Sequence, residues 1–459
     1  MKISPTSTRE NKPLQAETFL VQADSYNPQI IQCSIQDQLL KNIPVSVVFF
    51  YRQSIAHNLL INSLQKVLCD FPIFAGVLKS IDGNLFLDCN NQGVQFSVTE
   101  EDCNIEQVLH ELPAIKKKRL VPIINSKKII SNQSPILVIK LTYFTCGGMV
   151  LGLSWHHSVG DMHTFMYFMQ AWSNVVNQKE YIAPLIVKER DEYLLENIDQ
   201  NSQTIPDVRY LNTRKLLSLL YYLLFPARKK LTLRFYFSEQ ELKNMKQNFC
   251  EKTKRKLSKN DVLCTHLFNV ITKLDAYEQK RYLSIAVNYR SRMELPHNLL
   301  GNFISAVNIL GNRQANPFEL ARDIRSSIDN FKSMHFNPFA TKKYIEQNGG
   351  IKKIDRFVSK SIDPLNRTLL ISNWSNFGVY DITFGDLKPF YFTSIVDLPF
   401  PWLSGIIEGF SKNGLIYSVS LPSKLARKLM QIDNLKEIHK YRSLEEGIPE
   451  LVRKLEWLL

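Results

Sequence analysis

Apolar and polar positions in the first part of the chain alternate between the spacing of strands and that of helices. The run PVSVVFFYR (Pro44–Arg52) is rich in β-branched and aromatic residues, which predicts a strand. The run that follows, QSIAHNLLINSLQKVLCDF, has apolar residues at helical spacing and predicts a helix. The run Phe71–Cys89 predicts two strands joined at Asp82-Gly83, since Asp-Gly between apolar runs favours a hairpin.

Two longer apolar runs surround Cys146-Gly147-Gly148 in PILVIKLTYFTCGGMVLGLSW and predict another pair of strands. A helix is expected to begin near Asp161. In the second half, LTLRFYFSEQELKNMKQ predicts a strand and then a helix, and Ser258 or Asn260 is placed to cap the next helix. Later strands are predicted from YLSIAVNYR, FISAVNIL, TLLISNW and GLIYSVSLP. Strands alternating with helices throughout predict an α/β fold of the mixed α+β kind.

The length of 459 residues exceeds the usual size of one domain, so we expect two. Polar residues dominate from about 177 to 209, which is typical of a linker. We therefore predict a first domain at 1–185, a linker or crossover segment at 186–230 and a second domain at 231–459.

The run KLLSLLYYLLFPARKK (Lys215–Lys230) combines a short apolar stretch with basic flanks. Such a run could make weak contact with a membrane surface, or it could form a buried helix between the two domains. We favour the buried helix. No run in the chain reaches the roughly 18 uninterrupted apolar residues that a membrane-spanning helix needs.

The net charge of +14 raises nucleic acid, membranes and anionic ligands as partners. The basic residues cluster at Lys116–Arg119, Arg228–Lys230, Lys252–Lys259 and Lys352-Lys353. None of these clusters is interleaved with aromatic residues, and no helix-turn-helix or zinc pattern accompanies them, so we expect no nucleic-acid partner. A solvated loop is the simpler interpretation of each cluster.

The seven cysteines are scattered and never spaced as CxxC. This argues against a disulfide framework and against a zinc ribbon. We therefore expect a reducing, cytoplasmic compartment.

The stretch SWHHSVGD places His156 and His157 at the end of a predicted strand, with Asp161 where the next helix begins. Adjacent histidines on a tight turn rarely face one ion, and no H-E-x-x-H pattern or cysteine ligand supports a metal site. A Ser-His-Asp triad lacks its G-x-S-x-G turn, and Ser158 stands beside the histidine. General-base catalysis by one histidine fits better, since imidazole can take a proton from an alcohol or amine near neutral pH. Two histidines without a catalytic role are the alternative.

The surroundings of this motif resemble the BAHD acyltransferases, which are acyl-CoA-dependent enzymes. Pro135–Asp161 is similar to that family's paired apolar strands around Cys-Gly-Gly followed by HHxxxDG. The resemblance continues, in family order, at the segments SIQDQ from Ser34, LQKVLCDFPIFAGVL from Leu64, VNYRSRMELPHNLLGNF from Val287 and NWSNFGVYDITFGDLKP from Asn373. Together these segments cover nearly the whole chain.

The resemblance implies two chloramphenicol-acetyltransferase-like domains with an active-site channel at their interface. His157 would be the base that lets a hydroxyl or amine attack the acyl-CoA carbonyl directly, without an acyl-enzyme. Ser372, with Trp374 beside it, would hold the oxyanion. Asp161 would be structural, paired with Arg290 or Arg292, and His156 would support the turn.

The resemblance also implies the partners. Acyl-CoA would be a co-substrate, with no permanently bound cofactor and no metal, and the acceptor would be a small-molecule alcohol or amine. The CoA phosphates would meet Lys256, Ser258 and Lys259 in the Lys252–Lys259 cluster. The protein would act as a monomer in secondary metabolism.

Two departures from the family pattern leave two alternative functions open. Met162 replaces the glycine after the motif's aspartate, and the DFGWG signature is reduced to Thr383-Phe384-Gly385-Asp386-Leu387. One rival is a condensation-type acyltransferase that takes its acyl group from a carrier-protein thioester. The other is a catalytically inactive relative that acts as a binding module.

Overall fold

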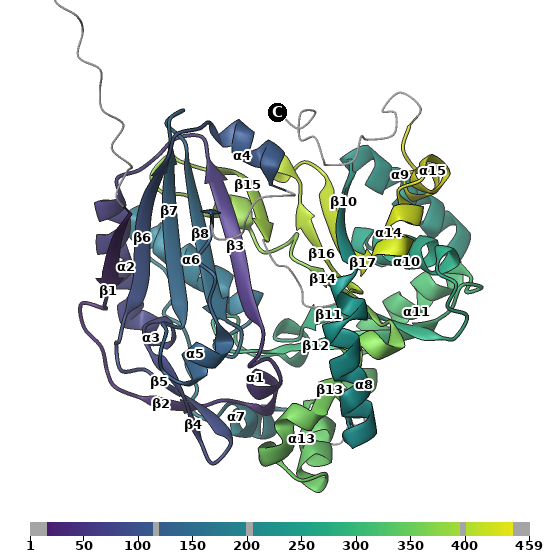
Figure 1. Cartoon of the computed structure of the whole chain (residues 1–459), viewed down its shortest axis with the longest axis horizontal. Coiled ribbons are helices and arrows are strands. Elements are labelled where there is room, and N and C mark those ends of the chain that lie inside the picture. The colour runs from purple at the N-terminus through teal and green to yellow at the C-terminus, as the bar shows by residue number, and fades with distance from the viewer. Residues whose placement is uncertain (1–15, 113–118, 199–204, 395–400, 444–459) are drawn as a thin grey trace, which may run out of the picture.

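Two six-stranded mixed sheets stand side by side in a computed structural model of the chain (Figure 1). The structure describes residues 16–112, 119–198, 205–394 and 401–443. The first sheet runs, in spatial order, through β1 (Glu17–Val21), β6 (Val94–Glu101), β7 (Leu137–Phe144), β8 (Met149–His156), β3 (Pro44–Tyr51) and β15 (Pro389–Ser394). The second runs through β10 (Lys230–Phe237), β17 (Leu415–Pro422), β16 (Leu403–Glu408), β14 (Leu369–Asn373), β11 (Arg281–Asn288) and β12 (Ile304–Gly311). This architecture confirms the predicted mixed α/β fold.

Three strands of the first sheet, β3, β7 and β8, lie at the predicted apolar runs, while β1, β6 and β15 were not predicted. The hairpin of β7 and β8 closes at Cys146–Gly148, and every residue of β8 is buried. A strand buried on both faces needs a continuous apolar run, which is why the sequence there shows no alternation. The helices α2 (His57–Asp70) and α6 (Met162–Val176) pack into the same core as these strands.

The Asp82-Gly83 turn joins β4 (Val77–Ile81) and β5 (Asn84–Asp88) as predicted. The residues before it differ from the prediction. Pro72–Ala75 forms the short helix α3 in place of the start of a strand, because Pro72 occupies the first helical position, where its missing N–H costs nothing.

Helices α9 (Glu239–Thr253), α10 (Lys259–Leu274) and α11 (Pro317–Asp329) accompany the second sheet, at the right of Figure 1. Ser258, rather than Asn260, caps α10: its hydroxyl accepts the Asp261 N–H, while the Asp261 carboxylate accepts the Ser258 N–H. The other helices and small strands are α1 (Ile35–Leu39), α4 (Ile105–Glu111), α5 (Ser126–Ile130), α7 (Arg190–Asn197), α8 (Thr213–Leu224), α12 (Phe331–Met334), α13 (Pro338–Gln347), α14 (Ser423–Leu429), α15 (Ile432–Ile438), β2 (Ile30–Gln32), β9 (Val208–Tyr210) and β13 (Phe357–Ser359).

One strand from the end of the chain joins the first sheet. β15 pairs with β3 in antiparallel register, and Phe384, Phe390 and Phe392 belong to the first core. Part of the predicted second domain, 231–459, therefore packs with residues of the predicted first domain, 1–185. This part includes the DFGWG-like segment.

The expectation of a buried helix between the domains at Lys215–Lys230 is wrong. The helix α8 forms, but none of its residues is buried. No helix in the described ranges is long and apolar enough to cross a membrane. Lys116–Lys118 of the first basic cluster lie outside the described residues.

Candidate active site

His157 lies in the turn between β8 and α6. β8 ends at His156, which pairs with Pro44 of β3, and the His157 N–H donates to the Ile43 carbonyl at 3.1 Å. The α6 helix begins at Met162 with Asp161 as its N-cap. The turn is therefore fixed at both ends, by a sheet edge and by a helix start.

The ring of His157 is held by an asparagine from the second half of the chain. His157 Nδ1 lies 3.0 Å from Asn302 Oδ1. The Asn302 amide nitrogen donates to Asp37 Oδ1 at 2.8 Å and to the His157 carbonyl at 2.7 Å, so Oδ1 is the acceptor end of the amide. Nδ1 therefore carries the proton, and Nε2 carries the lone pair that a general base needs.

Burial lowers the pKa of His157 below its ordinary value of 6.5. Asp161, the bond to Asn302 and Asp37 act in the opposite direction but do not cancel the effect of burial. The imidazole is therefore neutral at pH 7, which is the state in which it can accept a proton.

Asp161 is bound from three directions. Its carboxylate accepts the Thr164 N–H at 2.9 Å, which caps α6, and the Phe303 N–H at 3.0 Å. Arg290 donates to both of its oxygens, at 2.8 and 3.3 Å, and each side chain of this ion pair is only 2% exposed. Although burial raises the pKa of Asp161, the Arg290 charge and these bonds hold it below its ordinary value. Asp161 thus ties the turn to the loop before β12.

A second buried ion pair, whose arginine no motif singled out, stands on the other side of Asn302. Arg190 of α7 donates to Asp37 at 2.8 Å and to the Val159 carbonyl at 3.2 Å. Gly301 adopts φ +140°, and a Cβ there would lie 2.8 Å from Arg190 Nε. The Gly301-Asn302 pair of the resembled segment therefore has a physical reason: the glycine leaves room for Arg190, and the asparagine reaches His157.

His156 is fully buried, and its Nδ1 accepts the Ser158 N–H at 3.3 Å. Burial lowers the pKa of His156 to about 4, so this ring is neutral too. Its contacts stabilise the turn around His157.

Ser372 and Trp374 lie at the end of β14 in the second sheet. The Trp374 indole N–H donates to the Ser372 hydroxyl at 2.9 Å, and the Trp374 ring packs against the first core. Between them, the Asn373 amide donates to Asn260 Oδ1 at 2.7 Å. This bond joins the end of β14 to the first turn of α10.

The basic cluster reaches this region through α10. Ser258 and Lys259 stand just before Asn260, Lys259 is ion-paired with Glu239, and Lys256 is exposed. The structure thus brings Ser258 and Lys259 near Ser372 and Trp374, and it brings His157, Asp161 and Arg290 together. Within the described ranges, no hydrogen bond joins the residues around Ser372 to those around His157.

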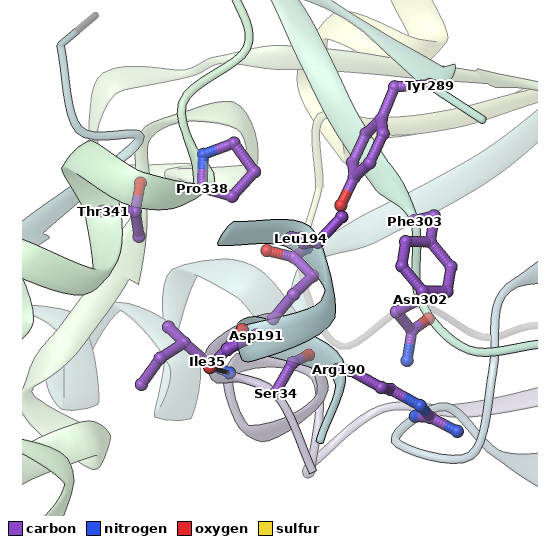
Figure 2. Close-up of a pocket in the computed structure, with 11 residues that line it drawn as sticks. Ser34, Ile35, Arg190, Asp191, Leu194, Tyr289, Asn302, Phe303, Pro338 and Thr341 are labelled. Atoms are coloured by element: carbon purple, nitrogen blue, oxygen red, sulfur yellow. Dashed lines mark hydrogen bonds between the residues drawn. The ribbon is translucent and has the colours of Figure 1, made fainter. Parts of the chain in front are cut away.

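A small cavity adjoins Asn302 (Figure 2). Its volume is about 20 Å³, enough for one water molecule and far too small for an acyl-CoA. Its lining residues include Ser34, Arg190, Asp191 and Phe303. The cavity is therefore a packing feature behind the base rather than a substrate site.

The reduced DFGWG segment is anchored to α6. The Thr383 carbonyl accepts the Ser173 hydroxyl at 2.7 Å, and the Gly385 N–H donates to Asn177 at 2.8 Å. The Phe384 ring lies 5.4 Å from that of Trp172. The two positions kept from the signature are thus a core side chain and a glycine with φ +63°.

Among the described residues, no group of three or more His, Cys, Asp or Glu side chains could hold a metal ion.

The fold is that of the two-domain, chloramphenicol-acetyltransferase-like acyltransferases. A model of the Transferase family matches residues 16–425. Because that match covers most of the chain, the protein belongs to this family, the BAHD acyltransferases, as the motifs predicted.

Named relatives agree with this assignment. The chain is 24% identical to shikimate O-hydroxycinnamoyltransferase of Nicotiana tabacum, over 77% of this chain and 83% of that protein. It is 24% identical to vinorine synthase of Rauvolfia serpentina, over 81% and 85%. The fold is similar to that of F. sporotrichioides TRI101 complexed with coenzyme A and T-2, with a TM-score of 0.69 and 17% identity over 89% of this chain and 98% of that one. The chain is thus an acyl-CoA-dependent transferase.

Proposed function

We propose that the protein moves an acyl group from coenzyme A to a hydroxyl or amine of a small molecule, with His157 as the general base. The observation that carries this proposal is the bond between His157 Nδ1 and Asn302 Oδ1. Since the amide nitrogen of Asn302 is engaged elsewhere, this bond fixes the tautomer whose Nε2 can accept a proton.

In the proposed reaction, Nε2 removes the proton of the acceptor as its oxygen or nitrogen attacks the thioester carbonyl carbon. The tetrahedral intermediate then collapses, the C–S bond breaks, and the CoA sulfur takes the proton from Nε2. No acyl-enzyme forms. The Ser372 hydroxyl, oriented by the Trp374 indole, donates to the oxyanion.

Lys256, Ser258 and Lys259 would bind the CoA phosphates. The support is their position beside Asn260, which the bond to Asn373 ties to the strand end carrying Ser372. Asp161, Arg290 and His156 would act through the turn that holds His157 rather than on the substrate. We also propose that the protein is a cytoplasmic monomer, with domains at 1–185 and 231–459 joined by 186–230.

The substitution His157→Ala tests the base. We expect turnover to fall by about 10²–10⁴-fold, because that is the usual contribution of a positioned acid or base. Affinity for CoA, measured by calorimetry, should be unchanged. The matched control is His297→Ala, which removes an imidazole that the reaction does not use. Turnover at the wild-type rate in His157→Ala would refute the assignment.

A further inference from the structure

The outward face of α8 is apolar and exposed. Leu217, Leu220, Tyr221, Leu224 and Phe225 recur at helical spacing, and their exposed fractions run from 46% to 63%. Scattered exposed apolar side chains are ordinary, but a continuous row along one helix face marks a surface that binds something. The helix is about 18 Å long, so this row forms an extended strip.

The inward face of α8 anchors the helix to the second domain. Leu216, Leu219, Tyr222 and Leu223 are half-buried, and Tyr222 lies close to Trp402 of the second core. The strip is therefore the face of α8 that points away from the protein.

A broad basic groove begins where α8 ends. It has a volume of about 810 Å³, and the residues that line it include Pro226, Lys229, Lys424, Arg427 and Lys428. The Ser423 N–H donates to the Lys229 carbonyl at 2.9 Å, which holds the start of α14 against the segment after α8. The groove thus begins at Pro226, the residue that follows the strip in the chain.

The charge of this surface is of one sign. From Arg209 to Lys230 the sequence has no aspartate or glutamate, and Ser423–Gln431 has none either. Apolar side chains on one helix face, with Lys and Arg beside them, are the composition of a helix that lies in the interface of a membrane with anionic lipids.

We propose that α8 and the adjoining groove dock the protein onto a membrane surface that bears anionic lipids. The leucine, tyrosine and phenylalanine side chains enter the headgroup region, and Lys229, Lys424 and Arg427 bind lipid headgroups. An acidic protein partner fits less well, because the strip is purely apolar, whereas a lipid surface offers an apolar interior for the strip and anionic headgroups for the lysines and arginine of the groove. This docking goes beyond the acyl transfer proposed above, which does not depend on it.

Co-sedimentation with vesicles tests the proposal. We expect the full chain to bind vesicles made of phosphatidylcholine and phosphatidylserine in equal parts, and to bind phosphatidylcholine vesicles weakly. Leu217→Glu with Tyr221→Glu should abolish binding. Lys424→Glu with Arg427→Glu should weaken it at least 25-fold, at about fivefold for each cation. The matched controls are Ile182→Glu, at another exposed apolar residue, and Lys128→Glu, at another exposed lysine.

Binding to neither vesicle type, or equal binding by the strip variants and the wild type, would overturn the proposal. So would a wild-type dimer that the strip variants dissociate, since the strip would then be covered by a second copy of the chain. All variants should retain wild-type affinity for CoA, so failure of the docking proposal is separate from failure of the proposed reaction.

Discussion

At the scale of single residues, the motif points to His157 as the proposed base but not to the side chain that orients its ring. His157 and Asp161 stand out in the sequence because two histidines and a carboxylate are closely spaced. Asn302 does not, although it holds the His157 ring from 145 positions away. An asparagine in a loop is common, and only the tertiary contact reveals that its amide sets the imidazole tautomer.

The pH dependence of kcat/KM should reflect the buried position of His157. The base must be neutral, and burial lowers its pKa below 6.5. Activity should therefore be constant through neutral pH and should fall only below pH 6.5, as the ring becomes protonated. A pH–rate profile whose acid limb lies at or above that value would contradict the assignment.

Asn302→Ala provides the matching variant for this profile. It should lower kcat with little change in KM for acyl-CoA, because the ring loses its orientation while the CoA site is untouched. Asn298→Ala, which removes an amide nearby in the chain that donates to the Ala183 carbonyl, is the control. Unchanged kcat in Asn302→Ala would mean that another contact sets the tautomer.

At the scale of elements, two buried ion pairs fix the turn between β8 and α6. The pair of Asp161 with Arg290 could be anticipated because the resembled segments contain both residues. The pair of Asp37 with Arg190 could not, since Arg190 lies in a polar stretch that the composition assigned to a linker. Composition describes the average of a segment, and a single buried arginine does not change that average.

Asp161→Asn should destabilise the protein. Asparagine can still cap α6, but it leaves the Arg290 charge buried without its partner. We expect a loss of about 3–5 kcal/mol in the free energy of unfolding, measured by urea denaturation. Asp386→Asn, at an exposed aspartate, should have no such effect. Lost activity with unchanged stability in Asp161→Asn would instead indicate a direct chemical role.

At the scale of the whole molecule, the predicted strands formed where the apolar runs lie, but β1, β6, β15 and β16 were not predicted and the arrangement of the strands did not follow from the pattern. The sequence predicts a strand or helix from local spacing alone. It does not reveal that β15 crosses to the first sheet, because that pairing joins residues more than 300 positions apart. The exposure of α8 was also missed, because an apolar run looks the same whether another domain covers it or not.

The basic cluster should govern affinity for the CoA donor. Lys256→Glu should raise KM for acyl-CoA roughly tenfold and leave kcat nearly unchanged, since it removes a charged contact to a phosphate far from the reacting carbonyl. Steady-state kinetics at constant salt measures both constants. Lys243→Glu makes the same charge change on an exposed position of α9 and should leave KM unchanged. Equal effects of the two variants would indicate a general effect of net charge rather than a phosphate site.

The most direct test of the central claim is the thermal unfolding of the purified protein with free CoA and a panel of acyl-CoAs. This measurement needs no acceptor. A donor present at about 100 times its dissociation constant should stabilise the folded state by about 2.7 kcal/mol and raise Tm. One acyl-CoA should do so more than the others, which would identify the donor class. No rise with any of them, together with transfer from an acyl-carrier thioester, would contradict the account.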